Sequence, residues 1–211
     1  MQRPDALIFD MDGTLWDAID SYCAVWNDTA RRLGIDRHVT YDELRPLMGK
    51  PLEEIYRVLM GPTGADPATF MPLLAERERD MMPGLGGRLY PGVRKTLDCL
   101  AARGVGLYMV SNCGADGLRN FLAYTGLGDL MTEALSYGAT GVDKDVNIRR
   151  LVERYNLRCP AYVGDVQRDS DSSHAAGVPV VYAAYGFGHI ADPDFVIHSF
   201  PDLLDLYGTE I

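Results

Sequence analysis

The stretch "ALIFDMDGTLWD", residues 6–17, contains the pattern that decides the expected fold. Four apolar residues lead directly into Asp10 and Asp12, and Gly13 and Thr14 then turn the chain. A short apolar run of this length predicts a buried strand, and alternate residues of a strand project to the same side. Two carboxylates aimed at one place repel each other, so the stretch predicts that a cation lies between them.

The composition limits the class of protein. The chain has 211 residues, 47% of them hydrophobic and 24% charged, which suits one ordinary domain or a core with a small appendage. The formal net charge of -10 argues against a nucleic-acid or anionic-membrane partner. The four cysteines show no CxxC pair, and no apolar run approaches the ~18 residues that a membrane span needs. We expect a soluble, cytoplasmic protein, and the sequence makes no prediction of its oligomeric state.

Short apolar runs alternate with helical patterns along the chain. The runs lie at 6–9, 105–110, 161–164 and 178–183, and the helical patterns at 92–104, 143–156 and 169–177. Runs without polar alternation are typical of strands buried on both faces, and strand–helix alternation favours parallel strands with right-handed crossovers. The sequence therefore predicts an α/β protein with a Rossmann-like open parallel sheet.

The first crossover is far longer than a strand–helix–strand connection requires, because residues 10–104 separate the first two runs. This interval has helical signals of its own. They are an apolar stripe over 19–33, a capping box at Thr40 and Glu43, an N-cap at Asp66, and first-turn prolines at Pro51 and Pro67. Pro91 is likewise expected in the first turn of the helical pattern at 92–104. We expect a helical insert over 16–86, with "PGLGGR" (83–88) as its return hinge, and a core of residues 1–15 and 87–211.

Polar side chains follow the apolar runs. They are Asp10 and Asp12 after the first, Ser111 and Asn112 after the second, Asp165 and Asp169 after the third, and Lys144 at the start of the preceding helix. In open α/β sheets, ligands bind beyond the carboxyl ends of the strands. Carboxylates ~4 Å apart repel by about 4 kcal/mol per pair at an effective dielectric near 20, which favours a bound divalent cation. A few all-oxygen ligands favour Mg²⁺ over a Ca²⁺ cage.

The same residues predict chemistry on a phosphate group. One aspartate of the first pair can ligate the metal and attack, while the other stands near the leaving group. The backbone N–H groups of Gly13 and Thr14 can face a phosphate. Ser111 can donate to a phosphoryl oxygen, and Lys144 can neutralise the charge that accumulates during transfer.

Four segments together resemble the motifs of the haloacid dehalogenase (HAD) superfamily, in the same order. They are "DMDGTL" (10–15), the apolar strand ending in Ser111, Lys144, and "GDVQRD" (164–169). The resemblance covers nearly the whole chain, and the insert is similar to the C1-type cap of that superfamily. The segment "AAYGFG" (183–188) further resembles phosphoglycolate-phosphatase-like members.

The resemblance implies a Mg²⁺-dependent phosphatase that acts on a small phosphorylated metabolite through an aspartyl-phosphate. Asp10 would be the nucleophile, and Asp12 would protonate the leaving oxygen and then activate water. Mg²⁺ would be held by the carboxylates of Asp10 and Asp165 and the backbone carbonyl of Asp12. Asp169 would support these ligands or orient Lys144. The residues expected at the substrate are Gly13, Thr14, Ser111, Asn112, Lys144 and, from the cap, Lys50.

The sequence departs from the family pattern at two places. Asp145 follows Lys144 where many members have proline, and "SDSS" (170–173) follows Asp169 where small apolar residues are usual. The first departure is expected to be harmless because the helical pattern after it is intact. The second predicts a more solvated helix.

Three other functions compete with hydrolysis. In related sugar-phosphate mutases (β-phosphoglucomutase-like), a glutamate precedes the fourth-motif aspartate and a histidine follows the first motif. This chain has Gly164 there and no histidine before His38, which favours water as the acceptor. The intact Asp10 argues against a catalytically silent binding module. A dehalogenase needs neither a metal nor an acid at the position of Asp12, so the presence of Asp12 and Asp165 argues against that activity.

Overall fold

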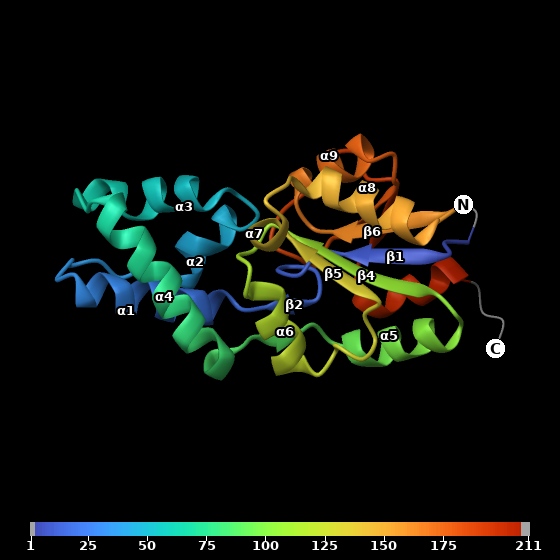
Figure 1. Ribbon diagram of the computed structural model, residues 1–211, viewed down its shortest axis with the longest axis horizontal. Helices are drawn as coiled ribbons and strands as arrows, with labels where there is room; N and C mark the ends of the chain where they lie inside the picture. The colour runs from blue at the N-terminus through green and yellow to red at the C-terminus, as the bar shows by residue number, and fades with distance from the viewer. Residues whose placement is uncertain (1–2, 208–211) are drawn as a thin grey trace. The chain divides into compact units, whose positions relative to one another are not determined.

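A six-stranded parallel sheet forms the centre of the larger of two compact units (Figure 1). The computed structural model describes residues 3–207. The strand order is β5-β4-β1-β6-β7-β8. The strands are β1 (Ala6–Phe9), β4 (Gly106–Ser111), β5 (Glu133–Ser136), β6 (Pro160–Gly164), β7 (Val180–Ala183) and β8 (Phe195–Ile197). This topology confirms the predicted α/β fold with a Rossmann-like parallel sheet.

The strand β1 lies in the middle of the sheet, and its position determines where the polar motif residues gather. Phe9 is in register with Met109 of β4 and with Val163 of β6. All four residues of β1 are fully buried, as expected for a strand covered on both faces. Because the three strands are parallel and aligned, the residues that follow each of them leave the sheet at one edge.

Helices cover both faces of this sheet (Figure 1). On one face α8 (Lys144–Tyr155) packs on β4 and β5, and α9 (Gln167–Ala175) packs on β6 and β7. On the other, α5 (Val93–Ala102) packs on β4 and on the 3-10 helix η3 (Phe200–Tyr207). Two shorter helices, α6 (Gly117–Thr125) and α7 (Tyr137–Thr140), flank β5 in sequence. The helical patterns expected over 92–104, 143–156 and 169–177 are thus confirmed.

Residues Asp17–Arg88 form the second compact unit. Its helices are α1 (Ile19–Arg32), α2 (Tyr41–Leu44), α3 (Leu52–Leu59) and α4 (Pro67–Leu85), with the 3-10 turns η1 (Arg45–Leu47) and η2 (Gly61–Thr63). The helices α1 and α4 pack together, and the Trp26 and Phe70 rings are 5.5 Å apart at their centroids. The chain passes between the units through two short paired strands, β2 (Trp16–Asp17) and β3 (Arg88–Leu89). Of the ranges expected for the core, residues 1–2 and 208–211 lie outside the described residues.

Several local predictions need correction. Asp66 caps α4 as expected, accepting from the N–H of Ala68 at 3.0 Å. Pro51 is the N-cap of α3 rather than part of its first turn, and Pro91 precedes the cap of α5. The helix α4 continues to Leu85, so the return turn begins at Gly86.

The sequence analysis missed the two edge strands. The strand β5 reads "EALS" and is only half-buried over most of its length, and β8 has three residues. The strand β5 forms no continuous apolar run, because an edge strand is less fully covered than a central one. The strand β8 reads "FVI" and is apolar, but it is shorter than the runs of about four residues or more that indicate a buried strand. Among the described residues, no helix has the length and apolar character needed to span a membrane.

The central position of β1 predicts a large cost for truncating its side chains. Ile8→Ala should lower the free energy of unfolding by about 2–5 kcal/mol, because Ile8 is fully buried. The matched control is Val196→Ala on the edge strand β8, where the side chain is 47% exposed. The control should change stability by less than about 0.5 kcal/mol. Urea unfolding followed by circular dichroism measures both, and equal effects would contradict this description of the core.

Candidate active site

Asp10 lies immediately beyond the end of β1 and enters a polar cluster in the core unit. Its backbone N–H donates to the carbonyl of Val163 at 2.9 Å, which extends the β1–β6 ladder by one residue. The side chain is buried, with the residue 7% exposed. The ladder therefore holds the carboxylate of Asp10 at the sheet edge with little freedom of its backbone.

Lys144 supplies the positive charge of the cluster. Its Nζ donates to Asp10 Oδ1 at 2.9 Å and to Asp169 Oδ1 at 2.6 Å. Lys144 begins α8 and is buried, and its Nζ lies 5.6 Å from the centre of the Tyr162 ring. One ammonium thus joins two carboxylates that are far apart in the sequence.

Asp165 follows β6 and is fully buried. Its Oδ2 accepts the backbone N–H of Phe187 at 2.8 Å, and its Oδ1 accepts the hydroxyl of Thr14 at 3.3 Å. Two glycines leave room for this carboxylate. A Cβ on Gly13 would lie 2.2 Å from Asp165 Oδ2, and one on Gly186 would lie 2.3 Å from its Cβ.

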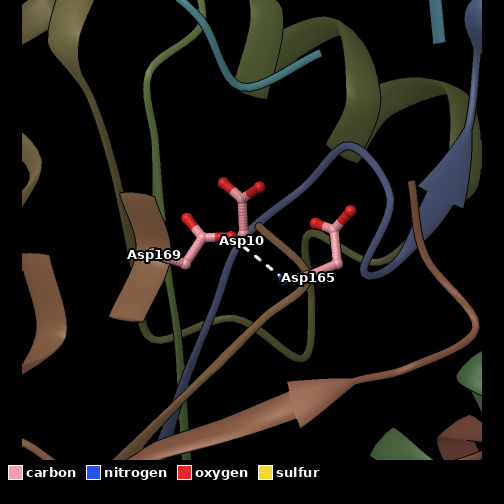
Figure 2. Close-up of side chains that lie close together, drawn as sticks. All are labelled: Asp10, Asp165 and Asp169. Carbon is pink, nitrogen blue, oxygen red and sulfur yellow. Dashed lines mark hydrogen bonds between the residues drawn. The ribbon is translucent and has the colours of Figure 1, made fainter. Parts of the chain in front are cut away.

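Asp169, in the first turn of α9, is also fully buried. Its Oδ2 accepts the backbone N–H groups of Asp165 at 3.0 Å and Val166 at 3.2 Å, while its Oδ1 accepts from Lys144. Figure 2 shows the three carboxylates of Asp10, Asp165 and Asp169 gathered side by side. One oxygen from each lies within 4.8 Å of the others, so the group is able to hold a metal ion.

The electrostatics of the cluster follow from its burial. Burial raises the pKa of Asp10 to about 6, against the opposing effect of the Lys144 ammonium. Burial also raises the pKa of Asp165 well above its ordinary value, and the neighbouring carboxylates of Asp169 and Asp10 add to the rise. Burial alone would lower the pKa of Lys144, but Asp10 and Asp169 outweigh it and the pKa lies well above the ordinary value. Lys144 is therefore a permanent cation, and the carboxylates favour any further positive charge.

Asp12 is not part of the group of three carboxylates that could hold a metal. It is half-buried, and its Oδ1 accepts the indole Nε1–H of Trp16 at 2.8 Å. Asp10 and Asp12 therefore have different partners although only one residue separates them. This difference suits different chemical roles for the two carboxyl groups.

The turn after Asp12 differs from the expectation. The N–H of Gly13 donates to the carbonyl of Trp16 at 2.9 Å, and that of Thr14 to Met11 at 3.4 Å. These two donors, expected to face a phosphate, are used within the turn. Gly13 has a φ of +84° and serves the close approach of Asp165, while Thr14 contributes its hydroxyl to that carboxylate.

The other predicted substrate residues lie in two places. Ser111 ends β4 at the same sheet edge, is buried, and its Oγ accepts the N–H of Cys113 at 3.3 Å. Asn112 follows it and is exposed. Lys50 belongs to the second unit, where its Nζ donates to Glu54 at 2.6 Å.

Sequence reasoning missed the segment after β7 as a part of the site. Phe187 and Gly186 enclose Asp165, and the hydroxyl of Tyr185 donates to the carbonyl of Thr14 at 2.9 Å. The sequence "AAYGFG" contains the residues concerned. Their contribution to the site is a backbone N–H and the space left by a glycine, and neither is indicated by a characteristic side chain in the sequence. Trp16, which contacts Asp12, lies inside the opening stretch, where the sequence analysis placed only the start of the insert.

Comparisons with known proteins give a consistent result. A family model described as haloacid dehalogenase-like hydrolase matches residues 7–183. A phosphoglycolate phosphatase of Rhodobacter capsulatus is 30% identical over 194 residues, covering 86% of this chain and 85% of that protein. A phosphoglycolate phosphatase of Synechococcus elongatus is 29% identical over 211 residues, covering 94% and 95%. A solved structure described as a predicted phosphoglycolate phosphatase from Haemophilus somnus has a TM-score of 0.86 at 21% identity, covering 98% and 99%.

The tight packing around Asp165 predicts that one added methyl group strongly weakens metal binding. Gly186→Ala should displace the Asp165 carboxylate, because the new Cβ would also lie 2.5 Å from the carbonyl oxygen of Gly13. We expect the affinity for divalent cations to fall at least about tenfold, measured by isothermal titration calorimetry. The matched control is Gly114→Ala, where a Cβ would meet nothing within 4 Å. Unchanged affinity in Gly186→Ala would contradict the tight packing around Asp165.

The raised pKa of Asp10 predicts a pH dependence of stability in the presence of a chelator. The pKa rises from 3.8 to about 6 on folding, so the folded protein holds this proton more tightly than the unfolded chain. The stability from Asp10 is fully present below pH 3.8 and is lost as the pH rises through about 6. Wild type should therefore lose stability relative to Asp10→Asn across this window in urea unfolding. A divalent cation should reduce the loss, whereas a constant difference between the two proteins would contradict the prediction.

Proposed function

This chain belongs to the haloacid dehalogenase-like hydrolase family, and we propose on that premise that it is a Mg²⁺-dependent phosphatase for a small phosphorylated metabolite. The family match over residues 7–183 confirms the resemblance in the sequence. With the relatives named phosphoglycolate phosphatase, it identifies a phosphoric monoester hydrolase of the HAD superfamily. The finer proposal concerns the metal, the covalent intermediate and the substrate.

One observation carries the mechanism: the buried carboxylate of Asp10, held by Lys144 at 2.9 Å beside two further carboxylates. A carboxylate fixed in this way is a nucleophile with a set direction of attack. Lys144 is suited to offset negative charge on a transferring phosphoryl group. The hydroxyl of Ser111 lies at the end of the neighbouring strand β4, at the same sheet edge, which supports its proposed contact with a phosphoryl oxygen.

The residues present fit a divalent cation. Asp10, Asp165 and Asp169 carry three negative charges when ionised and Lys144 carries one positive charge, so a divalent cation would balance the cluster. Asp169 accepts from the Lys144 ammonium and from two backbone N–H groups, whereas Asp165 accepts one backbone N–H and a hydroxyl at 3.3 Å. This difference favours a supporting role for Asp169. Asp10, Asp165 and the backbone carbonyl of Asp12 would hold Mg²⁺. Bound there, the ion would offset negative charge on the phosphate.

The reaction follows from these positions in two steps. An oxygen of Asp10 forms a bond to phosphorus while the bond to the leaving oxygen breaks, and the carboxyl group of Asp12 gives its proton to that oxygen. The carboxylate of Asp12 then takes a proton from water as the water oxygen bonds to phosphorus and the bond from Asp10 breaks. Inorganic phosphate leaves, and both aspartates return to their starting states.

We propose that the insert is a C1-type cap domain that helps select the substrate, with Lys50 as a contact residue. The expected ranges are 16–86 for the cap and 1–15 with 87–211 for the core. The names of the relatives favour a short monoester such as 2-phosphoglycolate. No two of the four cysteines, all of which lie within residues 3–207, are joined in a disulfide, which supports a reducing compartment such as the cytoplasm.

Hydrolysis is favoured over phosphoryl transfer between sugar positions by the space at Gly164. A Cβ there would lie 2.6 Å from the Cβ of Asp169. The additional carboxylate that mutase relatives have at this position would therefore displace Asp169 and its contact with Lys144. Water is the proposed acceptor.

Turnover of phosphate esters tests the proposal. In the presence of Mg²⁺, the protein should release stoichiometric inorganic phosphate from 2-phosphoglycolate and p-nitrophenyl phosphate. Excess chelator should abolish turnover, and Ca²⁺ should not restore it, because Ca²⁺ prefers more ligands and often bidentate carboxylates. Full activity in excess chelator would refute the proposed dependence on Mg²⁺. If β-glucose 1-phosphate were converted to glucose 6-phosphate faster than phosphate is released, the protein would be a mutase. If it hydrolysed none of a wide panel of phosphate esters, it would be a binding module.

Substitution of the two motif aspartates tests their roles. Asp10→Asn should be folded and inactive, because an amide is a poor nucleophile. Asp12→Asn should lose about 10²–10⁴-fold in turnover and accumulate a phosphoryl group on Asp10. Peptide mass spectrometry after acid quench locates that group, and a phosphoryl group on another residue would overturn the assignment. The matched control is Asp98→Asn on the exposed surface of α5, where Asp98 pairs with Arg94 and activity should be unchanged.

A further inference from the structure

Trp16 contacts a carboxyl group that the proposed reaction uses. Its indole Nε1–H donates to Asp12 Oδ1 at 2.8 Å. Trp16 is 2% exposed, so its N–H needs a partner within the protein. The contact joins a buried, rigid donor to a half-buried acid.

The indole of Trp16 is held on several sides within the core unit. Its ring meets the Phe121 ring edge-on, with centroids 4.9 Å apart. Its backbone carbonyl accepts the N–H of Gly13 at 2.9 Å, and its backbone N–H donates to Met11 at 3.3 Å. The backbone bonds therefore fix Trp16 in the turn that carries Asp12, and the Phe121 ring packs against its indole.

We propose that Trp16 is a positioning residue that fixes the Asp12 carboxyl group through Oδ1 for the two proton transfers. The proposal rests on the proposed phosphatase function. In a carboxylic acid the carbonyl oxygen accepts hydrogen bonds better than the hydroxyl oxygen, so the indole N–H on Oδ1 places the acidic proton on Oδ2. Oδ2 then gives this proton to the leaving oxygen in the first step and takes one from water in the second.

A phenylalanine at this position separates positioning from packing. Trp16→Phe keeps an aromatic ring against Phe121 and removes the N–H donor. The matched control is Trp26→Phe in the other unit, which makes the same change in a buried tryptophan. A role confined to packing predicts that both variants turn over substrate like the wild type.

The kinetic expectation is specific to proton transfer. Trp16→Phe should lower kcat on 2-phosphoglycolate or another alkyl phosphate by about ten- to a hundredfold, the range expected for losing a hydrogen bond to a carboxyl group that becomes charged as it gives up its proton. KM should change less than about threefold, because the lost contact acts on the transition state rather than on substrate binding. Trp26→Phe should leave both parameters unchanged.

The leaving group provides a second kinetic signature. p-Nitrophenolate leaves without protonation, so the first step on p-nitrophenyl phosphate should be little affected in Trp16→Phe. The second step needs Asp12 as a base and should be slowed. We expect a rapid burst of nitrophenolate equal to the enzyme concentration, followed by slow turnover, and no such burst with Trp26→Phe.

The contact itself is tested without any activity. The chain has two tryptophans, so its nitrogen-15 spectrum contains two indole N–H signals, which Trp26→Phe assigns. The Trp16 signal should move in Asp12→Asn, while the Trp26 signal should stay in place. This measurement needs no variant of Trp16, so it tests the contact even if Trp16→Phe fails to fold.

The outcomes separate the two proposals. A wild-type protein that hydrolyses no phosphate ester would refute the proposed function, and with it the role of Trp16 in that reaction. In an active wild type, an indole signal insensitive to Asp12→Asn would refute the contact. Wild-type kcat in Trp16→Phe, or a raised KM with unchanged kcat, would refute the positioning role while leaving the phosphatase assignment intact.

Discussion

Three buried carboxylates lie together, and the ammonium of Lys144 pairs with two of them, Asp10 and Asp169. The rest of the site is arranged around this constraint. Unpaired, each carboxylate would cost several kcal/mol to bury. Lys144 bridges Asp10 and Asp169, and backbone N–H groups of the β6–α9 turn and of Phe187 hold Asp169 and Asp165. The cluster is satisfied by hydrogen bonds and yet rich in negative charge, which is the condition under which a divalent cation binds well.

The parallel sheet makes this concentration of charge feasible. With β1 between β4 and β6, the chain segments that follow three strands meet at one edge. The backbone ladder fixes their positions, so the carboxylates keep their places in spite of mutual repulsion. The segment after β7 closes the arrangement, because Phe187 donates to Asp165 and Tyr185 holds the turn at Thr14.

The two aspartates of the first motif illustrate how environment assigns chemistry. Asp10 faces Lys144 and the other carboxylates, and burial raises its pKa to about 6. Asp12 faces the indole of Trp16 outside that group. The proposed roles, a metal-binding nucleophile at Asp10 and a proton-exchanging acid at Asp12, would need these different surroundings.

Continuous apolar runs in the sequence indicate the central strands, and the carboxylates, the hydroxyl and the lysine at their ends indicate a cation and a phosphate group. Much of the fold and of the site is therefore predictable from the sequence, because these signals are local. The edge strand β5 was missed because its half-buried residues form no continuous apolar run. The edge strand β8 was missed because its apolar run has only three residues. Pro51 and Pro91 were misplaced by one or two residues, because helix ends depend on capping geometry that the pattern does not specify.

The sequence alone determined which side chains are proposed to carry the chemistry, since charge, nucleophilicity and metal preference belong to residue types. Only the tertiary structure decided how those groups pair. Lys144 pairs with both Asp10 and Asp169, and Gly13 gives space to Asp165 rather than an N–H to a phosphate. The Asp12–Trp16 contact likewise depends on the course of the turn. These pairings depend on the distances between side chains and on the space left by glycines, and both exist only once the chain is folded.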